Sequence, residues 1–559
     1  MNLLGKAMDK AFWQNVRELA CYGFFRKCVI DCWNEYCEDK EIPALKYSDF
    51  KMFFTCGDRA TYEKGFFARR NALNAAAFMS LLYPGDEKYL NYLMDIIYII
   101  CDEYTWCLPA HQLQIEHNDN SHIDLFSSET AFALAEIYTM LNDRLDPLIK
   151  SRIEYEIDRR IFTSYEAEDP YEHWEKWTNN WVAVCTGSIA CSYMLMRPDK
   201  VSYLLPRFER AMERFLTGYN DDGICAEGCA YWDYGFGFYV IYSEMVKTFT
   251  EGEINHFEES KVKNIATFIQ KVFLSGKSSI SFSDSELKAY YPIGIQHYLK
   301  TQYPEDVKVY DIAYGNIHIA ARSISFSLRT VTWFNPNFYL NPDIVEDEME
   351  FLAEATQWFV KKNQIYGFAA KGGNNAEPHN HNDVGTFIFA KGGRQIIADI
   401  GSAAYTRDYF IPEKRYNYFE TQSLSHNLPI INGCQQKNGK SYKAGSIKLE
   451  NGELQIEFAD AYGIAHLASV CRKFTFEDDS VTLTDSFDYS GDGDIVERFV
   501  TFIEPRVIEN TVILDECTMI LPGGSDVNIS TKTVKNKKLL YIIDVTVLAN
   551  KESFSCKIK

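Results

Sequence analysis

KGGNNAEPHNHNDVGTFIFAKGGRQIIADI, residues 371–400, places a polar, turn-rich loop directly before two apolar runs. The loop holds two of the chain's eleven histidines, His379 and His381, two residues apart. The apolar runs flank Lys391-Gly392-Gly393, a short glycine turn that is typical of a β-hairpin. The stretch therefore predicts antiparallel strands, with acid–base and ligand groups concentrated beside the hairpin.

Further strands are expected on the C-terminal side of this hairpin. From about residue 346 onward, short apolar or alternating segments are separated by Gly, Asp and Asn turns, which is typical of a β-sandwich. The clearest of these segments are 446–449, 453–458, 469–476, 480–487 and 495–503.

The N-terminal part has a different pattern, in which apolar residues recur at helical spacing and the connections are short. Consecutive helices with short links pack as antiparallel neighbours, and their number predicts a helical array or toroid. The expected helices cover 66–82, 87–104, 127–141, 147–162, 180–195, 203–217, 234–250 and 257–274. The helix at 127 is expected to begin with the Ser-Ser-Glu-Thr capping sequence.

The change from helices to strands implies an α+β multidomain protein. Its boundary is expected within 320–350, where Asn335-Pro336-Asn337 and Asn341-Pro342-Asp343 are candidate breaks. We therefore divide the chain into a helical domain, 1–340, and an antiparallel β-sandwich domain, 341–559. A chain of 559 residues is too long for a single core, which agrees with this division.

The composition excludes some classes of partner. The formal net charge is −21, whereas nucleic-acid binding needs a basic surface, so nucleic acid is not expected as the main partner. No apolar run reaches the length of a membrane span, so no membrane partner is expected. Aromatic residues make up 15% of the chain, which fits either a ring-rich core or rings that stack on sugars.

The cysteines and the first residues bear on location. Fifteen cysteines are scattered through the chain without a pair of the CxxC type, and many lie in apolar stretches, as reduced core thiols do. The first residues, MNLLGKAMDKAFWQNVREL, predict an amphipathic helix rather than a signal peptide. A cytoplasmic location is therefore expected, and self-association into a homo-oligomer is compatible with the sequence.

The histidine loop contains a candidate metal site. In an extended chain His379 and His381 would point to the same side, so that one binds a metal and the other faces a substrate. Asp399, at the end of the hairpin, and His426 complete a His/Asp/His set that suits zinc. Two alternatives remain: each histidine satisfied within the fold, or a non-haem iron site made by His381-Asn382-Asp383 with His426.

Two polar clusters lie in the helical half. Asn179 and Asn180 open a helix in KWTNNWVAVC, residues 176–185, where an amide either caps the helix or hydrogen-bonds a substrate carboxylate. The second cluster, DDGICAEGCAYWDYGFGFY, residues 221–239, places several tyrosines at the start of a helix. Most of these rings are expected in the core, and an exposed phenol would serve as an acid or a base.

Several segments resemble, in order, those of the heparinase II/III-type polysaccharide lyases and their oligoalginate-lyase relatives. The resemblance spans roughly residues 60–440, and it is most specific in the C-terminal segments. The segments are ARRNALNAAAFMSLLYPGDEKYL, WCLPAH, IDLFSSETAFALAEI, TNNWVAVC, CAEGCAYWDYGFGFY, KGGNNAEPHNHNDVGTF, IIADIGSAAYT and RYNYFETQSLSHNLPIINGCQQ.

The resemblance implies an N-terminal α/α toroid, an incomplete helical barrel, followed by a C-terminal antiparallel β-sandwich. It also implies a carbon–oxygen lyase that cleaves uronic-acid-containing glycans, of the glycosaminoglycan or alginate type, by β-elimination to 4,5-unsaturated products. The partner would be an anionic uronate oligo- or polysaccharide. By motif position, a structural zinc ion would be bound by His381, Asp399 and His426.

The resemblance also implies roles for other residues. Asn180, or its neighbour Asn179, and His379 match the positions that neutralise or polarise the uronate carboxylate. Tyr231, with Tyr234 second, matches the family tyrosine that serves as base, acid or both, and His379 is the alternative base. Candidates for other substrate contacts are Arg69, Arg70, His111, Lys176, Trp181 and Arg415, of which Arg69 and Arg70 fit equally well as helix-surface charges.

Two other functions remain open from the sequence. A non-catalytic glycan-binding protein would keep the same fold without the chemistry, and the paired amides, Tyr231 and His379 argue against it. The iron oxygenase rests on the short H-x-D motif alone, and a long helical domain in front of it is unexpected.

Overall fold

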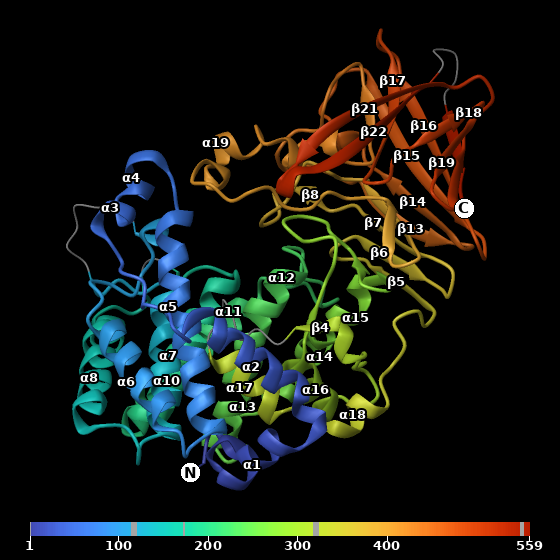
Figure 1. Ribbon diagram of the computed structural model, residues 1–559. Coiled ribbons are helices and arrows are strands. Elements are labelled where there is room, and N and C mark those ends of the chain that lie inside the picture. The colour runs from blue at the N-terminus through green and yellow to red at the C-terminus, as the bar shows by residue number, and fades with distance from the viewer. Residues whose placement is uncertain (1, 113–119, 172–173, 317–323, 548–552) are drawn as a thin grey trace. The chain divides into compact units, whose positions relative to one another are not determined.

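The computed structural model describes residues 2–112, 120–171, 174–316, 324–547 and 553–559. The chain forms two compact units, each assembled from several segments. Unit 1 consists of Met1–Gly218, Trp232–Lys263 and Tyr291–Pro342, and unit 2 of Tyr219–Tyr231, Asn264–Tyr290 and Asp343–Lys559. Figure 1 shows helices throughout unit 1 and strands in most of unit 2.

Unit 1 is the helical toroid, built mainly of antiparallel helices joined by short links (Figure 1). Its helices are α1 (Lys10–Glu18), α2 (Gly23–Tyr36), α3 (Tyr47–Phe50), α4 (Met52–Cys56), α5 (Ala60–Leu82), α6 (Glu87–Cys101), α7 (Leu125–Met140), α8 (Pro147–Ile157), α9 (Thr163–Ala167), α10 (Asn180–Met196), α11 (Pro198–Leu216), α13 (Gly237–Phe249), α16 (Ile293–Gln302), α17 (Ile324–Thr332) and α18 (Pro336–Leu340). A short parallel pair, β3 (Tyr291–Pro292) and β4 (Gly315–Asn316), also lies in this unit.

Helix α10 is at the centre of unit 1. It packs against α7, α11 and α13, and it is apolar nearly all round, with buried residues from Asn180 to Met194. A helix without a polar face is stable only when neighbours cover it on every side. Asn180, the first residue of α10, and the N-cap residue Asn179 are therefore held by a rigid element.

Helix α7 begins two residues earlier than the sequence analysis expects. The N-cap is Asp124, whose side chain accepts a hydrogen bond from the backbone N–H of Ser127, while the Ser127 hydroxyl accepts one from the N–H of Asp124. This reciprocal pair satisfies two amide groups that the first turn of a helix leaves free. The Ser-Ser-Glu-Thr stretch thus lies inside the first turn instead of preceding it.

Unit 2 is the β-sandwich, and its main sheets are entirely antiparallel. A five-stranded sheet has the order β10-β9-β7-β6-β5, with β5 (Met349–Ala353), β6 (Trp358–Lys362), β7 (Gly367–Lys371), β9 (Phe387–Lys391) and β10 (Arg394–Ile397). A four-stranded sheet has the order β11-β17-β22-β21, with β11 (Pro429–Ile431), β17 (Ile495–Thr501), β21 (Asp526–Val534) and β22 (Lys538–Val547).

The largest sheet has eight strands in the order β13-β14-β15-β16-β23-β20-β19-β18. They are β13 (Ser446–Glu450), β14 (Glu453–Glu457), β15 (Leu467–Phe476), β16 (Val481–Tyr489), β18 (Arg506–Ile508), β19 (Thr511–Leu514), β20 (Cys517–Ile520) and β23 (Ser553–Ile558). The remaining elements of unit 2 are α12 (Cys229–Tyr231), α15 (Phe268–Val272), β1 (Phe273–Ser275), β2 (Ser278–Ser279), β8 (Asn374–Asn375), β12 (Gly439–Lys443) and α19 (Pro412–Arg415), and α14 (Ser260–Ala266) crosses from unit 1 into unit 2.

One apolar core joins the sheets of unit 2. Phe368 and Phe387 of the five-stranded sheet pack on Phe474 of the eight-stranded sheet, with ring centroids 4.8 and 5.1 Å away. Phe499, from the four-stranded sheet, lies 6.3 Å from Phe387. Inward-facing rings from facing sheets are the packing of a β-sandwich, so the predicted fold class, a helical toroid followed by an antiparallel sandwich, is confirmed.

The predicted hairpin is confirmed. Strands β9 and β10 pair antiparallel across Lys391–Arg394, and Gly392 and Gly393 both have positive φ, at 58° and 77°. That left-handed turn suits glycine, and it matches the twist of the two strands. The hairpin fixes the position of the histidine loop, which directly precedes β9.

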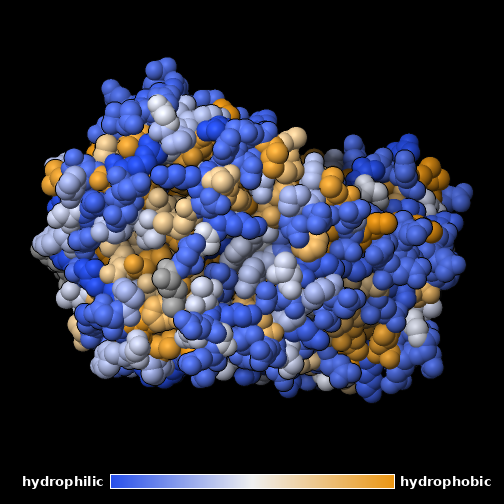
Figure 2. All heavy atoms as spheres, turned by 90° about the horizontal axis from the view of Figure 1, so that it is seen from below, coloured by the Kyte–Doolittle hydropathy of each residue, from blue (hydrophilic) through white to orange (hydrophobic). Residues whose placement is uncertain are grey.

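One face of the molecule is mainly polar. Figure 2 shows one face on which hydrophilic residues predominate and hydrophobic residues gather in a few patches. Within the parts of the chain that the structure describes, no helix combines the length and apolar character needed to cross a membrane.

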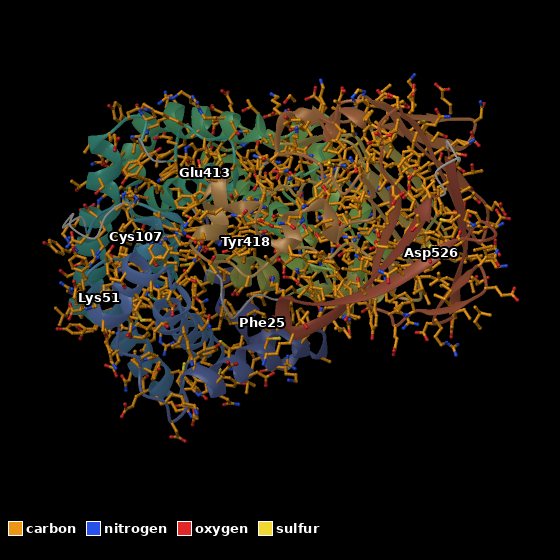
Figure 3. All side chains as sticks on the ribbon, turned by 90° about the horizontal axis from the view of Figure 1, so that it is seen from above. Phe25, Lys51, Cys107, Glu413, Tyr418 and Asp526 are labelled. Carbon is orange, nitrogen blue, oxygen red and sulfur yellow. The ribbon has the colours of Figure 1, made fainter. Side chains whose placement is uncertain are left out.

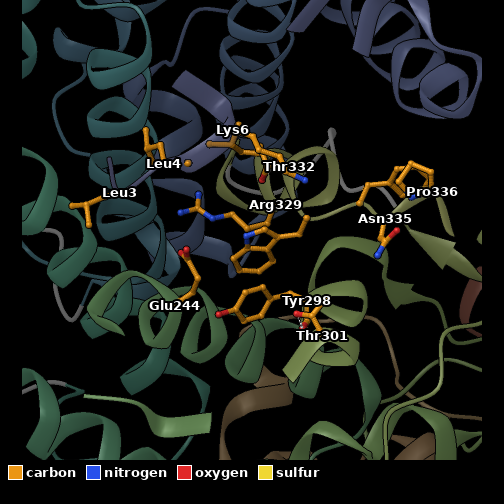
Figure 4. A pocket seen from close by; sticks show the side chains of 14 residues that line it. Leu3, Leu4, Lys6, Glu244, Tyr298, Thr301, Arg329, Thr332, Asn335 and Pro336 are labelled. Carbon is orange, nitrogen blue, oxygen red and sulfur yellow. Dashed lines mark hydrogen bonds between the residues drawn. The ribbon is translucent and has the colours of Figure 1, made fainter. Parts of the chain in front are cut away.

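Unit 1 contains a cavity of about 450 Å³ that holds none of the residues singled out above. The N-terminal residues Leu3–Lys6 contribute to its lining, together with Glu244, Tyr298 and Arg329 (Figure 4). Arg329 is buried in an ion pair with Glu136, so its charge is already neutralised. This cavity is therefore a feature of the helical packing.

Candidate functional site

The histidine loop is held in a strained turn and not in the extended form expected above. His379 has φ of +57°, in the left-handed region that non-glycine residues seldom occupy. Such strain persists only where neighbours fix the residue, and it is common at functional sites. His379 and His381 nevertheless meet at one acceptor, because both rings reach the carboxylate of Asp284.

Asp284 connects the groups of this site in unit 2. It is fully buried, and its oxygens lie 2.9 Å from His379 Nδ1, 3.1 Å from His381 Nε2 and 3.1 Å from Arg415 Nη2. The hydroxyl of Tyr409 also donates to it. Burial favours the neutral acid, but the hydrogen bonds from both histidines and the charge of Arg415 outweigh it and hold the pKa of Asp284 far below its usual range.

An ionised Asp284 determines which nitrogen of His379 carries a proton. A carboxylate only accepts hydrogen bonds, so His379 donates through Nδ1. Its other nitrogen, Nε2, is then the basic one. This is the arrangement by which a buried carboxylate orients a catalytic imidazole in other enzymes.

Tyr231 stacks on His379. The two ring centroids are 4.2 Å apart, and Tyr231 Oη lies 3.2 Å from His379 Nδ1 and 2.8 Å from Tyr405 Oη. Burial raises the pKa of Tyr231 well above its ordinary value, and Tyr405 and Asp284 raise it further. The phenol therefore holds its proton at neutral pH, next to an imidazole whose Nε2 has no hydrogen-bond partner among the described residues.

His381, Asp399 and His426 form a three-residue cluster whose ligand atoms lie within 4.8 Å of one another. All three side chains are fully buried. Since metal ions are bound by such sets of imidazole and carboxylate groups, the cluster matches the predicted ligand set in its membership.

The hydrogen bonds of the cluster test whether a metal ion fits. His381 Nε2 faces Asp284 and His426 Nε2 faces the carbonyl of Glu420 at 3.2 Å, so each Nε2 carries the proton. The buried Nδ1 of His381 has no hydrogen-bond partner among the described residues, and His426 Nδ1 lies 2.9 Å from Asp399 Oδ2. Both Nδ1 atoms thus face the cluster, and the Nε2 atoms make the outer hydrogen bonds that zinc-binding histidines make. A carboxylate only accepts hydrogen bonds, so His426 Nδ1 donates to Asp399 here, and a metal ion would have to displace that proton.

The residues expected for an iron site do not come together in the same way. Asp383 is fully buried in an ion pair with Lys371, with Oδ1 and Nζ 2.8 Å apart. The described cluster contains Asp399 in its place. The H-x-D motif of the iron hypothesis is therefore part of an internal ion pair.

The segment after β10 surrounds Asp284. Arg415, at the end of α19, donates from Nη2 to the carbonyl of Asn380 at 3.0 Å and lies over the ring of Tyr409, 4.4 Å from its centroid. Figure 3 labels Glu413 and Tyr418, which lie on either side of Arg415 in this segment. Arg415 thus supports the loop and Asp284, in addition to being a candidate for substrate contact.

In unit 1, Asn179 and Asn180 lie at the start of α10. Asn179 is the N-cap, and its Oδ1 accepts from the N–H of Trp181 at 3.2 Å. Asn180 is buried and lies against Gly235, where an added Cβ would be 3.0 Å from the Asn180 Cβ. The capping role of Asn179 leaves Asn180 as the amide without that structural task.

Tyr234 lies in the π-helical turn η5 (Trp232–Phe236) of unit 1, and its hydroxyl donates to Glu129. Tyr231 precedes this turn and belongs to unit 2. The two candidate tyrosines therefore have different partners, a carboxylate for Tyr234 and an imidazole for Tyr231.

The other substrate candidates in unit 1 have three kinds of environment. His111 is bound to Asp124 at 2.7 Å and contacts Trp181, with ring centroids 4.7 Å apart. Arg69 and Arg70 both bind one oxygen of Glu103, at 3.0 and 2.6 Å, so neither is a free surface charge. Lys176 is exposed.

The sequence analysis missed Asp284, Tyr409 and Glu227. Asp284 lies in SFSDSEL, residues 281–287, which has no recognisable pattern and is 95 residues from His379. Glu227 lies in the quoted CAEGC segment; burial raises its pKa, although His379 acts in the opposite direction. Tyr405 was within a quoted segment, IIADIGSAAYT, but received no role.

Comparison with known proteins bears on the fold and on the C-terminal domain. Residues 358–538 match the family Heparinase II/III-like, C-terminal. A crystal structure of heparinase III is similar at 14% identity and a TM-score of 0.61, covering 89% of this chain and 77% of that chain. A heparan sulfate lyase from Pedobacter heparinus is similar at 12% identity and a TM-score of 0.55, covering 98% and 92%.

The chondroitin AC lyase of Streptomyces coelicolor A3, solved in complex with chondroitin sulphate, has a TM-score of 0.58 at 10% identity, covering 98% of this chain and 82% of that chain. No curated protein matches the chain. These structures show that the chain has a toroid-and-sandwich fold. Its residues 358–538 are similar to the C-terminal domain of heparinase II/III-like proteins.

Proposed function

We propose that the chain is a polysaccharide lyase that cleaves uronic-acid-containing glycans by β-elimination. The observation that carries the proposal is the pairing of Tyr231 with His379, whose Nδ1 is held by the buried carboxylate of Asp284. This supplies a proton donor and a basic nitrogen at one place. Positioned acid–base groups of this kind accelerate proton transfers by about 10²–10⁴-fold.

The reaction needs a base, an acid and neutralisation of the uronate carboxylate. His379 Nε2 takes the proton from C5, the electron pair forms the C4–C5 double bond, and the C4–O bond breaks. The departing oxygen takes a proton from the Tyr231 hydroxyl. No water is consumed, and the product is a 4,5-unsaturated sugar. The protonated state of Tyr231 favours it as the acid, and thus His379 as the base.

Asn180 is proposed to hydrogen-bond the uronate carboxylate, which lowers the energy of the enolate-like intermediate. Two facts support Asn180 over Asn179: the family position, and the use of the Asn179 side chain as the cap of α10. His111 and Trp181, in mutual contact, are candidates for binding a neighbouring sugar.

We propose zinc as the ion of the His381, Asp399 and His426 cluster. When bound, it would cross-link the histidine loop to β10 and to the segment before β11. The chain's own contribution is to orient the loop, because Asp284 bonds both His379 and the ligand His381. The role proposed for the metal is therefore structural.

A glycosaminoglycan is the proposed substrate class, with alginate as the alternative. The family match and the glycosaminoglycan lyases among the similar structures support the first. A reducing compartment is proposed for the protein, because no disulfide joins its fifteen cysteines, all of which the structure describes, and ten of them are buried. Homo-oligomer formation stays a prediction.

The test is the ultraviolet absorbance of the conjugated product when the protein is mixed with heparan, chondroitin, hyaluronan or alginate fragments. Tyr231→Phe and His379→Ala should each reduce kcat by about 10²–10⁴-fold. Tyr203→Phe is a matched control, since Tyr203 is 85% exposed on α11. Binding of a fragment without any absorbance change would favour the non-catalytic glycan-binding protein instead.

A further inference from the structure

Unit 1 holds a second cavity, larger than the one in Figure 4, at about 660 Å³. Residues of α3, of the N-terminal half of α5 and of the C-terminal end of α6 line it. Except for Arg69, none of the residues discussed for the reaction lines it. The cavity therefore needs an explanation of its own.

Aromatic rings dominate the lining. Tyr47, Tyr98 and Tyr104 are 69, 45 and 51% exposed, although tyrosine rings are usually buried for the most part. Phe50 lies behind them and meets both Tyr62 and Tyr104 edge to face, with centroid distances of 5.4 and 6.4 Å. Exposed rings thus stand on a rigid aromatic base, which is an arrangement that marks binding surfaces.

Glu103 adds a buried hydrogen-bond acceptor to the lining. Its Oε1 accepts hydrogen bonds from the guanidinium groups of Arg69 and Arg70, and these two cations neutralise the charge of the carboxylate. Its Oε2 is buried and has no hydrogen-bond partner among the described residues. Buried acceptors are nearly always satisfied, so this oxygen calls for a donor from a bound molecule.

The charges of the lining balance. Lys46 and Arg69 are cationic, whereas Asp102 and Glu103 are anionic. Asp102 is also bound by Arg152, with the charged atoms 2.7 Å apart. The cavity therefore has no net charge that would select a phosphate, a sulfate or an ammonium group.

We propose that this cavity binds a pyranose ring of a glycan. The C–H face of the ring would stack on an exposed tyrosine, and a ring hydroxyl would donate to Glu103 Oε2. A sugar needs no charge from its site. It offers an apolar face, which fits the exposed tyrosine rings, and hydroxyl donors, which fit Glu103 Oε2. That the sugar belongs to the glycan being cleaved rests on the proposed function.

The experiment uses the full chain with Tyr231→Phe, so that turnover is slow during the titration. Hexasaccharides of heparan and chondroitin, and the neutral cellohexaose, are titrated by calorimetry into this protein and into versions that also carry Tyr98→Ala or Tyr47→Ala. Each added substitution should weaken binding by about five- to tenfold, as expected for loss of one aromatic contact. Tyr203→Ala, on a different helix and 85% exposed, should leave the affinity unchanged.

Hydrogen–deuterium exchange then locates the binding. Residues 43–50 and 96–104 should gain protection on addition of the hexasaccharides, and this gain should be lost in Tyr98→Ala. Equal affinities in all variants, with no protection of these residues, would overturn the proposal. So would binding of choline at this cavity without binding of any saccharide.

The two proposals fail separately. If wild-type protein yields unsaturated product while Tyr98→Ala and Tyr47→Ala bind as the parent does, the cavity proposal is wrong and the lyase stands. If saccharides bind through the cavity but no uronate gives product, the lyase is wrong and the saccharide site stands.

Discussion

At the scale of single residues, Asp284 is the group that connects the proposed base to the proposed metal site. Its buried carboxylate accepts hydrogen bonds from four side chains, those of His379, His381, Arg415 and Tyr409. The same group therefore sets the proton position of the proposed base and the orientation of a proposed metal ligand. Activity and metal binding are expected to depend on it together.

Asp284→Asn is predicted to reduce both properties. A neutral amide cannot accept hydrogen bonds from two histidines as the carboxylate does, so His379 loses the group that orients it. By analogy with other buried carboxylates that hydrogen-bond a catalytic imidazole, kcat should fall by about 10²-fold or more. Zinc affinity should fall by about 10–100-fold, the usual effect of losing an outer hydrogen-bond partner. Steady-state kinetics and competition with a zinc chelator measure the two effects.

The control is Asp479→Asn, which removes an exposed carboxylate in the turn between β15 and β16. Unchanged zinc affinity in Asp284→Asn, with only kcat reduced, would show that zinc binding by His381 does not depend on its hydrogen bond to Asp284.

His381→Ala gives a separate prediction for the metal. Removal of one of three ligands should lower zinc content, thermal stability and activity together, because the loop that holds His379 loses its cross-link. Metal analysis, thermal unfolding and the absorbance assay measure these effects. A metal-free variant with the stability and activity of the wild type would contradict the structural role of the metal.

The residues of this site differ in how far the sequence predicts them. His381, Asp399 and His426 follow from the family resemblance, and the structure brings them together. Asp284 could not be predicted, because a lone Asp in a serine-rich stretch has no local signal, and only the fold brings it to His379 from 95 residues away. The left-handed turn at His379 was missed because the two histidines were placed on an extended chain, and a positive φ at a residue other than glycine has no clear signal in the sequence.

At the scale of elements, the start of α10 depends on one close approach. Gly218, just after α11, passes so near to Thr178 that an added Cβ would lie 2.1 Å from the Thr178 carbonyl oxygen. Thr178 directly precedes Asn179 and Asn180. A side chain at Gly218 would therefore displace the segment that positions the two amides.

Gly218→Ala is predicted to destabilise unit 1 by about 1–3 kcal/mol, the usual cost of forcing an atom into a filled space, and to lower kcat. The control is Gly85→Ala, because no atom lies within 4 Å of an added Cβ there and Gly85 does not have a positive φ. Denaturant unfolding and the absorbance assay measure the two effects. Equal stability of both variants would contradict the close approach.

Helix α15 provides a prediction about pH. Burial lowers the pKa of Lys271 to about 8, although Asp222 acts in the opposite direction. The folded pKa is below the unfolded value, so the unfolded chain binds more protons between about pH 8 and pH 10.4, and stability rises with pH in that range. Lys271→Met should therefore stabilise the protein at pH 7 by about 1–3 kcal/mol.

This advantage should shrink as the pH rises from about 8 towards 10. Urea unfolding at several pH values measures it, with the exposed Lys448→Met on β13 as control. An advantage that stays constant with pH would show that charge burial at Lys271 is not its cause.

Some element boundaries are set by tertiary contacts and not by the local sequence pattern. The helix expected over 257–274 ends earlier, as α14 and α15, because Phe273–Ser275 pairs with Ser278–Ser279 as β1 and β2. Leu274 also touches Gly367 of β7, where an added Cβ would be 2.3 Å from its carbonyl oxygen. Phe273–Ser275 therefore form a strand although their sequence pattern is helical, because strand pairing and contacts with β7 determine their conformation.

At the scale of the whole molecule, the net charge of −21 acts on any anionic substrate before contact. Repulsion between like charges is long-ranged at low salt and is screened at about 8 Å at physiological ionic strength. The kcat/KM for a sulfated oligosaccharide should therefore rise a few-fold between 10 and 150 mM NaCl, and less for an unsulfated one. A fall in kcat/KM with salt would show that a local basic surface dominates the approach.

The order of the segments along the chain has a consequence for synthesis. Unit 2 includes Tyr219–Tyr231 and Asn264–Tyr290, which leave the ribosome long before the strands that they join. A truncated polypeptide ending near residue 340 would carry these stretches, Tyr231 and Asp284 among them, with no sheet to receive them. Gene fragments cut at the apparent helix-to-strand boundary are therefore expected to yield insoluble product, whereas release of the complete chain lets both units close.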